Sequence, residues 1–167
     1  MAQKEELLRS IKKAMQGEMD SVTLYANAAA HSQDPEVREF FSARREEERR
    51  HYNYLLKYYQ EIAQDKCPPE EELAALQQPN LHPMFSAAFV QRIGADQYLF
   101  SAISTALLLE KDAFEHYHKC SLLTDNITLQ SFFGLLEKWE IRHYDELLGI
   151  QKDAEIYYWE QNNFEPF

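Results

Sequence analysis

The feature that most constrains this 167-residue chain is a nine-residue segment that occurs twice. The sequence "ERRHYNYLL" occupies residues 48–56, and "EIRHYDELL" occupies residues 140–148. Displacing the chain by 92 residues superposes these segments and also aligns Glu18 with Glu110 and Tyr25 with Tyr117. Because the register holds without a gap between the upstream residues and the repeated segments, the chain is predicted to contain two copies of one structural unit.

The first copy is predicted to be a helical hairpin over residues 3–65. An amphipathic helix over residues 3–31 is indicated by apolar residues that recur at intervals of three and four, namely Leu7, Leu8, Ile11, Met15, Val22 and Tyr25. Asp34 followed by Pro35 predicts the start of the second helix, since an aspartate caps free backbone amides and proline suits the first helical turn.

The second copy is predicted to be a hairpin over residues 94–161. Its helices are expected to cover residues 94–122, with a short helical lead-in at 83–91, and residues from Asn126 to about Gln161. No long segment of either hairpin contains a strong helix breaker, and strands have no obvious place.

A proline-rich crossover over residues 66–93 is expected to join the two hairpins, and "PEEELAALQQ" within it suits a short helix. Residues 162–167 form a tail. The prediction is therefore an all-α four-helix bundle with one long crossover between helices 2 and 3, forming a single domain over residues 1–167.

Composition excludes several classes of function. The formal net charge of −11 disfavours a nucleic-acid partner, because phosphate binding depends on clusters of Lys and Arg. Cys67 and Cys120 are too few for a four-thiolate metal site. The longest apolar run, "AISTALLL", is much shorter than the ~20 residues of a membrane span, and no secretory signal is visible. A soluble, cytoplasmic protein without a membrane partner is expected.

The repeat aligns glutamates and histidines, residue types that commonly bind metal ions in proteins. Residues three apart share a helix face, so Glu48 with His51, and Glu140 with His143, each present an oxygen and a nitrogen to one point. One further carboxylate comes from each remaining helix, Glu18 and Glu110. Four carboxylates and two imidazoles inside a bundle suit two iron ions, with manganese possible.

We hypothesise that Glu48 and Glu140 bridge the two ions. Glu18 and His51 would complete one position, and Glu110 and His143 the other. Without metal, such buried carboxylates repel one another, which makes a purely structural role for the set costly.

Other residues of the repeat have simpler interpretations. Tyr25 and Tyr117 lie two turns after Glu18 and Glu110 on the same face and are the candidate catalytic residues beside the ligands. There a phenol could hydrogen-bond a ligand carboxylate or supply an electron, and the alternative is packing in the core. The repeated phenylalanines are predicted to be core residues: Phe40, Phe41, Phe132 and Phe133. The histidines that have no counterpart in the repeat are not expected to bind metal: His31, His82, His116 and His118.

The chain resembles the rubrerythrin-like branch of the ferritin-like di-iron carboxylate superfamily. The resemblance rests on the pairs Glu18 with Tyr25, Glu48 with His51, Glu110 with Tyr117, and Glu140 with His143. It implies a di-iron oxidoreductase that reacts with hydrogen peroxide or dioxygen in defence against oxidative stress or in iron handling. It also implies a homodimer.

Two departures from the family pattern narrow these expectations. With only two cysteines the chain cannot build the four-cysteine rubredoxin domain of typical members, so a separate electron-donor protein such as a rubredoxin is expected. An additional carboxylate is typical one turn after the third-helix glutamate, where this chain has Ala113, which leaves ferroxidase chemistry open. The same residues are also compatible with iron storage, a dimanganese catalase-like site, an oxygenase with an organic substrate, or a metal-free interaction module that kept the fold.

Overall fold

The computed structural model describes residues 2–66 and 85–162 of the chain, and helices account for nearly all of these residues. The helices are α1 (Ala2–His31), α2 (Pro35–Ala63), α4 (Ala87–Ala95), α5 (Gln97–Leu122) and α6 (Ile127–Gln161). No strand occurs in these described ranges, which confirms the all-α prediction. The predicted short helix within "PEEELAALQQ" and nearly all of the tail lie outside the described residues.

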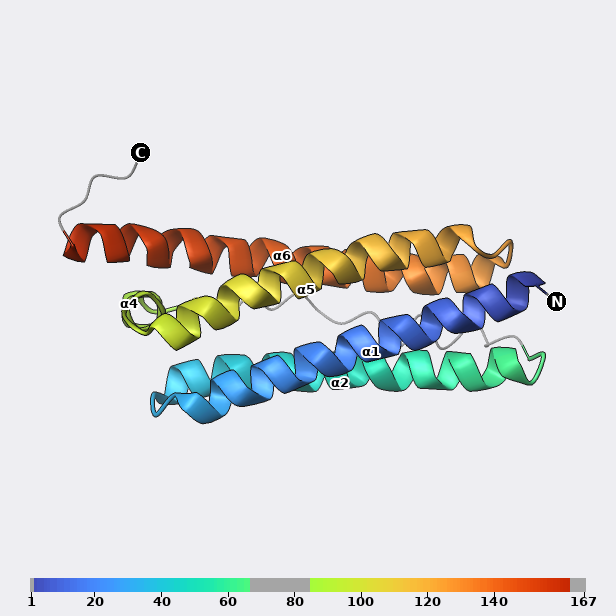
Figure 1. The fold of residues 1–167 in the computed structure, drawn as a ribbon, viewed down its shortest axis with the longest axis horizontal. Coiled ribbons are helices and arrows are strands. Elements are labelled where there is room, and N and C mark those ends of the chain that lie inside the picture. The colour runs from blue at the N-terminus through green and yellow to red at the C-terminus, as the bar shows by residue number, and fades with distance from the viewer. Residues whose placement is uncertain (1, 67–84, 163–167) are drawn as a thin grey trace.

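The four long helices form two antiparallel hairpins that lie side by side (Figure 1). α1 pairs with α2, α5 pairs with α6, and the hairpins meet where α1 packs against α5. The short helix α4 crosses one end of the bundle and packs against α6 and α5. This is the predicted bundle of two hairpins.

Capping side chains fix the residues at which the helices begin. The side chain of Asp34 accepts a hydrogen bond from the backbone N–H of Val37, and Asn126 does the same for Leu129 at the start of α6. The helical lead-in predicted at 83–91 corresponds to α4 at Ala87–Ala95, and the helix predicted over residues 94–122 begins later than expected. The side chain of Asp96 caps a new helix by accepting from the N–H groups of Tyr98 and Leu99, so α4 ends at Ala95 and α5 begins at Gln97.

A polar layer divides the apolar core into two clusters. One cluster lies toward the end that α4 covers and includes Phe41, Phe89 and Ile103. The other lies toward the opposite end and includes Leu55 and Tyr117. All four repeated phenylalanines are buried, as predicted: Phe40, Phe41, Phe132 and Phe133. Because the apolar clusters hold both ends of the bundle, the polar side chains between them are enclosed.

The contact of α4 with α6 depends on a glycine. A Cβ atom at Gly94 would lie 2.7 Å from the carbonyl oxygen of Ala154, closer than any normal contact. By contrast, a Cβ atom at Gly149 of α6 would meet nothing within 4 Å. Gly94 therefore allows the backbones of α4 and α6 to approach each other.

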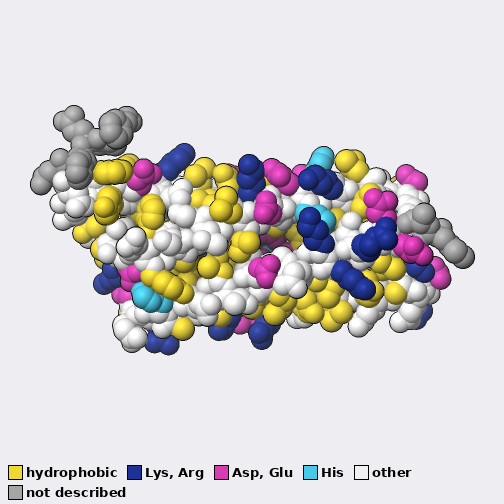
Figure 2. All heavy atoms as spheres, in the orientation of Figure 1, with side chains coloured by type: hydrophobic (Ala, Val, Ile, Leu, Met, Phe, Trp, Pro, Cys, Tyr) yellow, Lys and Arg dark blue, Asp and Glu magenta, His cyan; other side chains and the backbone are white. Residues whose placement is uncertain are grey.

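The surface mixes charges with exposed apolar side chains. On the face that Figure 2 shows, acidic and basic side chains are interspersed, with hydrophobic side chains between them. Among the large hydrophobic residues that the structure describes, Leu108, Leu122 and Ile127 are the most exposed, at 66%, 73% and 74%. Among the described helices, none combines the length and the apolarity that a membrane crossing requires.

Candidate dinuclear metal centre

The six predicted metal ligands meet in the polar layer between the two apolar clusters. Glu18 comes from α1, Glu48 and His51 from α2, Glu110 from α5, and Glu140 and His143 from α6. None of these residues is more than 5% exposed. The helical spacing of three places each glutamate and histidine of a pair on one face, and the antiparallel packing brings the four helices to the same level.

The donor atoms form two overlapping groups. One group consists of Glu18, Glu48, His51 and Glu140, and the other of Glu48, Glu110, Glu140 and His143; within each, one donor atom per residue lies within 4.8 Å of the rest. Glu48 and Glu140 belong to both groups. This sharing is the arrangement that the bridging hypothesis requires.

Both histidines direct Nδ1 toward the carboxylates. Nδ1 of His51 lies 2.7 Å from Oε1 of Glu140 and 3.4 Å from Oε2 of Glu48. Nδ1 of His143 lies 3.2 Å from Oε1 of Glu48 and 3.3 Å from Oε2 of Glu140. The two imidazole rings stack with their centroids 5.8 Å apart.

Several of these donor atoms are buried without a hydrogen-bond partner, although their neighbours are close. They are Oε1 of Glu48, both carboxylate oxygens of Glu140, and Nδ1 of His51 and His143. An unsatisfied buried polar atom costs about 1–3 kcal/mol, so a cluster of them is costly unless something binds there. Oxygen and imidazole donors that converge in this way fit a pair of first-row divalent metal ions.

Two tyrosines hold the outer carboxylates from across the bundle. Tyr25 on α1 donates a hydrogen bond to Glu110 on α5, and Tyr117 on α5 donates one to Glu18 on α1. Both phenols are buried. The structure shows both the contact and the core packing considered from the sequence, since each phenol contacts a cluster carboxylate while its ring packs in one of the apolar clusters. In each case, the glutamate that accepts the hydrogen bond belongs to the opposite hairpin.

The surroundings of the two histidines differ, and the repeat did not predict this difference. Nε2 of His143 lies 2.8 Å from Oε2 of Glu47, and the same oxygen accepts a hydrogen bond from Arg44. The other terminal nitrogen of Arg44 pairs with Glu146 on α6. At His51, the ring of Trp139 stacks on the imidazole at 5.1 Å between centroids. Glu47 lies in the charged run "RREEERR", so the sequence carried no signal that singled it out.

The cluster divides into groups with raised and lowered pKa values. Burial, together with the charges of Glu140 and Glu48, raises the pKa of Glu18 well above its usual range, and the pKa of Glu110 is raised for the same reasons. Burial would also raise the pKa of Glu140, but the positive charge of His51 and the close contacts with Glu110 and His143 together outweigh burial and hold that pKa well below the usual range.

The pKa values of the two histidines are raised, although burial alone would lower them. Burial alone would lower the pKa of His51, but the carboxylate of Glu140 raises it well above its usual range. The nearby carboxylates of Glu110 and Glu140 do the same for the pKa of His143. These shifts favour protonated imidazoles beside the shared carboxylates in the metal-free protein, and metal ions would replace their protons.

The described histidines that have no counterpart in the repeat lie outside this cluster. Nε2 of His31 lies 2.9 Å from Asp96, Nε2 of His116 lies 2.8 Å from a backbone oxygen, and Nδ1 of His118 lies 3.3 Å from Glu137. His82 lies outside the described residues.

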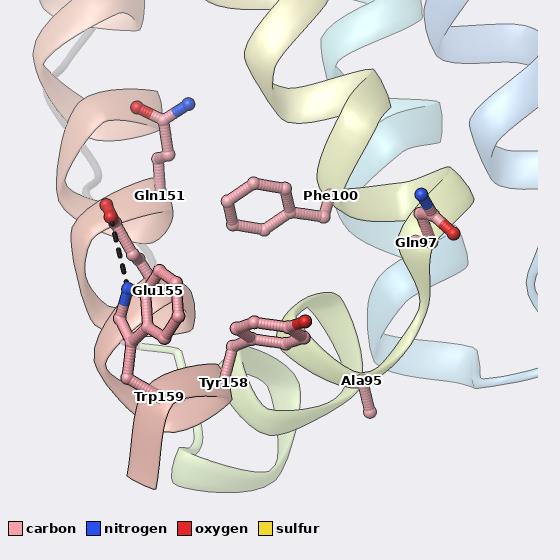
Figure 3. Close-up of a pocket in the computed structure, with 7 residues that line it drawn as sticks. All are labelled: Ala95, Gln97, Phe100, Gln151, Glu155, Tyr158 and Trp159. Atoms are coloured by element: carbon pink, nitrogen blue, oxygen red, sulfur yellow. Dashed lines mark hydrogen bonds between the residues drawn. The ribbon is translucent and has the colours of Figure 1, made fainter. Parts of the chain in front are cut away.

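A separate pocket lies at the end of the bundle that α4 covers. It has a volume of 670 Å³ and is lined by Ala95, Gln97, Phe100, Gln151, Glu155, Tyr158 and Trp159. In Figure 3, α6 provides Tyr158 and Trp159, and the indole N–H of Trp159 donates to Glu155. Phe100 precedes Glu110 on α5 by a helical rise of roughly 15 Å, so this pocket is distinct from the carboxylate cluster.

Comparison with known proteins identifies one family. A family model described as Rubrerythrin matches residues 6–151, which include all six candidate ligands and both tyrosines. Neither a curated protein nor a solved structure matches the chain.

Proposed function

Because the chain belongs to the rubrerythrin family, we propose that it is a di-iron oxidoreductase that reduces hydrogen peroxide. The observation that supports this proposal is the pair of overlapping donor groups that share Glu48 and Glu140. In the proposed centre these two carboxylates bridge the ions. Glu18 and His51 complete one position, and Glu110 and His143 complete the other.

The proposed residues divide the work of binding and positioning. Each histidine would bind through Nδ1, the ring nitrogen that faces the shared carboxylates. Tyr25 and Tyr117 would keep Glu110 and Glu18 in place by donating hydrogen bonds. Burial and the charge of Glu110 raise the pKa of Tyr25, and burial and the charge of Glu18 raise that of Tyr117, so both phenols stay protonated as donors.

When bound, two ferrous ions supply one electron each, and with two protons these reduce one hydrogen peroxide to two water molecules. The near-complete burial of the six ligands favours a small oxidant over a bulky organic substrate. It also keeps bulk water away from the reacting centre. The electrons would be restored by a donor protein such as a rubredoxin, and a homodimer is the proposed assembly.

The test is reconstitution with ferrous iron without oxygen, followed by counting of the iron and manganese in each chain. Two iron ions per chain are expected, and Glu140→Ala should lose both because it removes the carboxylate that both groups share. Asp145→Ala is the matched control, since Asp145 is exposed on the same helix. A Glu140→Ala protein that keeps two ions would disprove the bridging role.

The oxidant is tested by mixing the loaded protein with hydrogen peroxide or with dioxygen in a stopped-flow spectrometer. We expect one peroxide to oxidise both ferrous ions, faster than dioxygen does at equal concentration. Faster oxidation by dioxygen, with uptake of iron beyond two ions per chain, would instead establish a ferroxidase. Manganese in the protein as purified would favour a catalase-like site, and failure to bind either metal would favour an interaction module.

A further inference from the structure

The two halves of the metal centre differ at one position that the repeat relates. Displacement by 92 residues aligns Glu47 with Trp139, and both residues contact a candidate metal-binding histidine of the other hairpin. Glu47 contacts His143, whereas Trp139 contacts His51. The pseudo-symmetric site is therefore surrounded by a carboxylate on one side and an indole on the other.

The carboxylate side is fixed by charge. Oε2 of Glu47 lies 2.8 Å from Nε2 of His143, the ring nitrogen that faces away from the shared carboxylates. Arg44 donates to the same oxygen at 2.8 Å, and Arg44 is itself held by Glu146. A carboxylate that accepts the outer N–H of a metal-bound histidine fixes the ring and strengthens the opposite nitrogen as a ligand.

The indole side fixes the ring plane without accepting a proton. The rings of Trp139 and His51 are nearly parallel, at 12°. An indole N–H is a donor only, so Trp139 cannot accept the outer N–H of His51 and cannot make its Nδ1 more basic. Stacking thus orients His51 but leaves it a weaker electron donor than His143.

We propose that the two metal positions are unequal, and that the position at His143 binds its ion first and more tightly because Glu47 and Arg44 support that histidine. This inference rests on the proposed function, since it concerns the order in which the same site fills. Carboxylate partners of metal-bound histidines change metal affinity by about 10–100-fold. The side chain of Glu47 is 32% exposed, so solvent screening places the expected difference near tenfold.

The affinity difference is tested by calorimetric titration of the metal-free protein with Zn²⁺, which binds the same ligand types without redox change. The wild-type protein should show two binding events with Kd values about tenfold apart. Glu47→Gln keeps the shape but removes the charge, and it should bring the tighter event close to the weaker one. Glu46→Gln, next to it and pairing with Arg45 on the surface, should leave both events unchanged.

The order of filling is tested by NMR of protein labelled with ¹⁵N-histidine. One equivalent of Zn²⁺ should shift the ring nitrogens of His143 before those of His51, and this order can be read in the wild-type protein even if a variant does not fold. Two events of equal affinity, or earlier filling at His51, would overturn the inference while leaving the proposed dinuclear site intact. Binding of neither Zn²⁺ nor iron would instead overturn the proposed function itself.

Discussion

Tyr25 on α1 donates its phenolic hydrogen bond to Glu110 on α5, so a side chain of the first hairpin holds a candidate ligand of the second. Tyr117 and Glu18 make the reciprocal contact in the opposite direction. The two phenols therefore connect α1 and α5 on either side of the carboxylate cluster. Each outer carboxylate is positioned by the opposite hairpin.

Replacing Tyr25 with phenylalanine should weaken metal binding without preventing it. Tyr25→Phe keeps the buried ring but leaves Glu110 without its donor, and we expect about a tenfold loss of affinity for one of the two ions. Competition with a chelator of known affinity measures this change. Tyr117→Phe should give the same loss through Glu18. If the rings served only to fill the core, the two variants would bind both ions with unchanged affinity.

Metal binding should release protons and become tighter as the pH rises. His51 and His143 have pKa values raised above 6.5 in the metal-free protein, so at pH 6.5 most molecules carry a proton on each ring that a bound ion must replace. Because the pKa values of Glu18 and Glu110 are also raised, each of these carboxyl groups can release up to one further proton.

Loading two Zn²⁺ ions at pH 6.5 should therefore release more than one proton per chain, with one each from His51, His143, Glu18 and Glu110 as the upper limit. An indicator dye in weakly buffered solution measures the release, and repeating the titration at higher pH should give less release and tighter binding. Binding that is independent of pH would show that the ligands are already deprotonated before the metal arrives.

Replacing Arg44 should destabilise the fold even without metal. Arg44→Leu introduces the residue type found at the aligned position 136, but it leaves Glu47 and Glu146 without their shared cation. Breaking a buried ion pair costs about 3–5 kcal/mol, and the partial exposure of Glu47 favours the lower end. Chemical denaturation of the metal-free protein measures this loss. Lys111→Ala is the control, because its pair with Glu115 is solvent-exposed and should contribute less than about 1 kcal/mol.

A methyl group at position 94 should disturb the packing of α4. Gly94→Ala places a Cβ atom against the carbonyl of Ala154, and overpacking of this kind costs about 1–3 kcal/mol. Gly149→Ala meets open space within α6 and should instead stabilise the protein by up to about 1 kcal/mol through helix propensity. Thermal unfolding compares the two variants. Equal effects would show that α4 does not depend on the close approach.

The bundle could be predicted from the sequence because its signals are local and occur twice. Helical spacing, the caps at Asp34 and Asn126, and the repeat itself each indicate the same two hairpins, and the family match agrees with the ferritin-like bundle. The break between α4 and α5 was predicted too early, between residues 91 and 94, whereas the structure places it at Asp96, whose side chain caps the start of α5.

The candidate ligands could be predicted because the repeat pairs each of them with a residue of the same type. The surrounding residues could not, since they break the repeat: Glu47 aligns with Trp139, and Arg44 aligns with Leu136. Which of several adjacent glutamates faces a histidine of another helix depends on the rotation of α2 against α6. Long-range packing fixes that rotation, and the sequence of α2 alone does not.

The division of ligands between the hairpins has a consequence for how the protein is held together. Each donor group takes three residues from one hairpin and a glutamate from the other, Glu140 in one case and Glu48 in the other. Neither hairpin alone supplies all the ligands of a metal position, so each bound ion would act as a cross-link between the two hairpins. The interface between the hairpins then resembles that of a metal-bridged dimer whose two subunits happen to be joined in a single polypeptide.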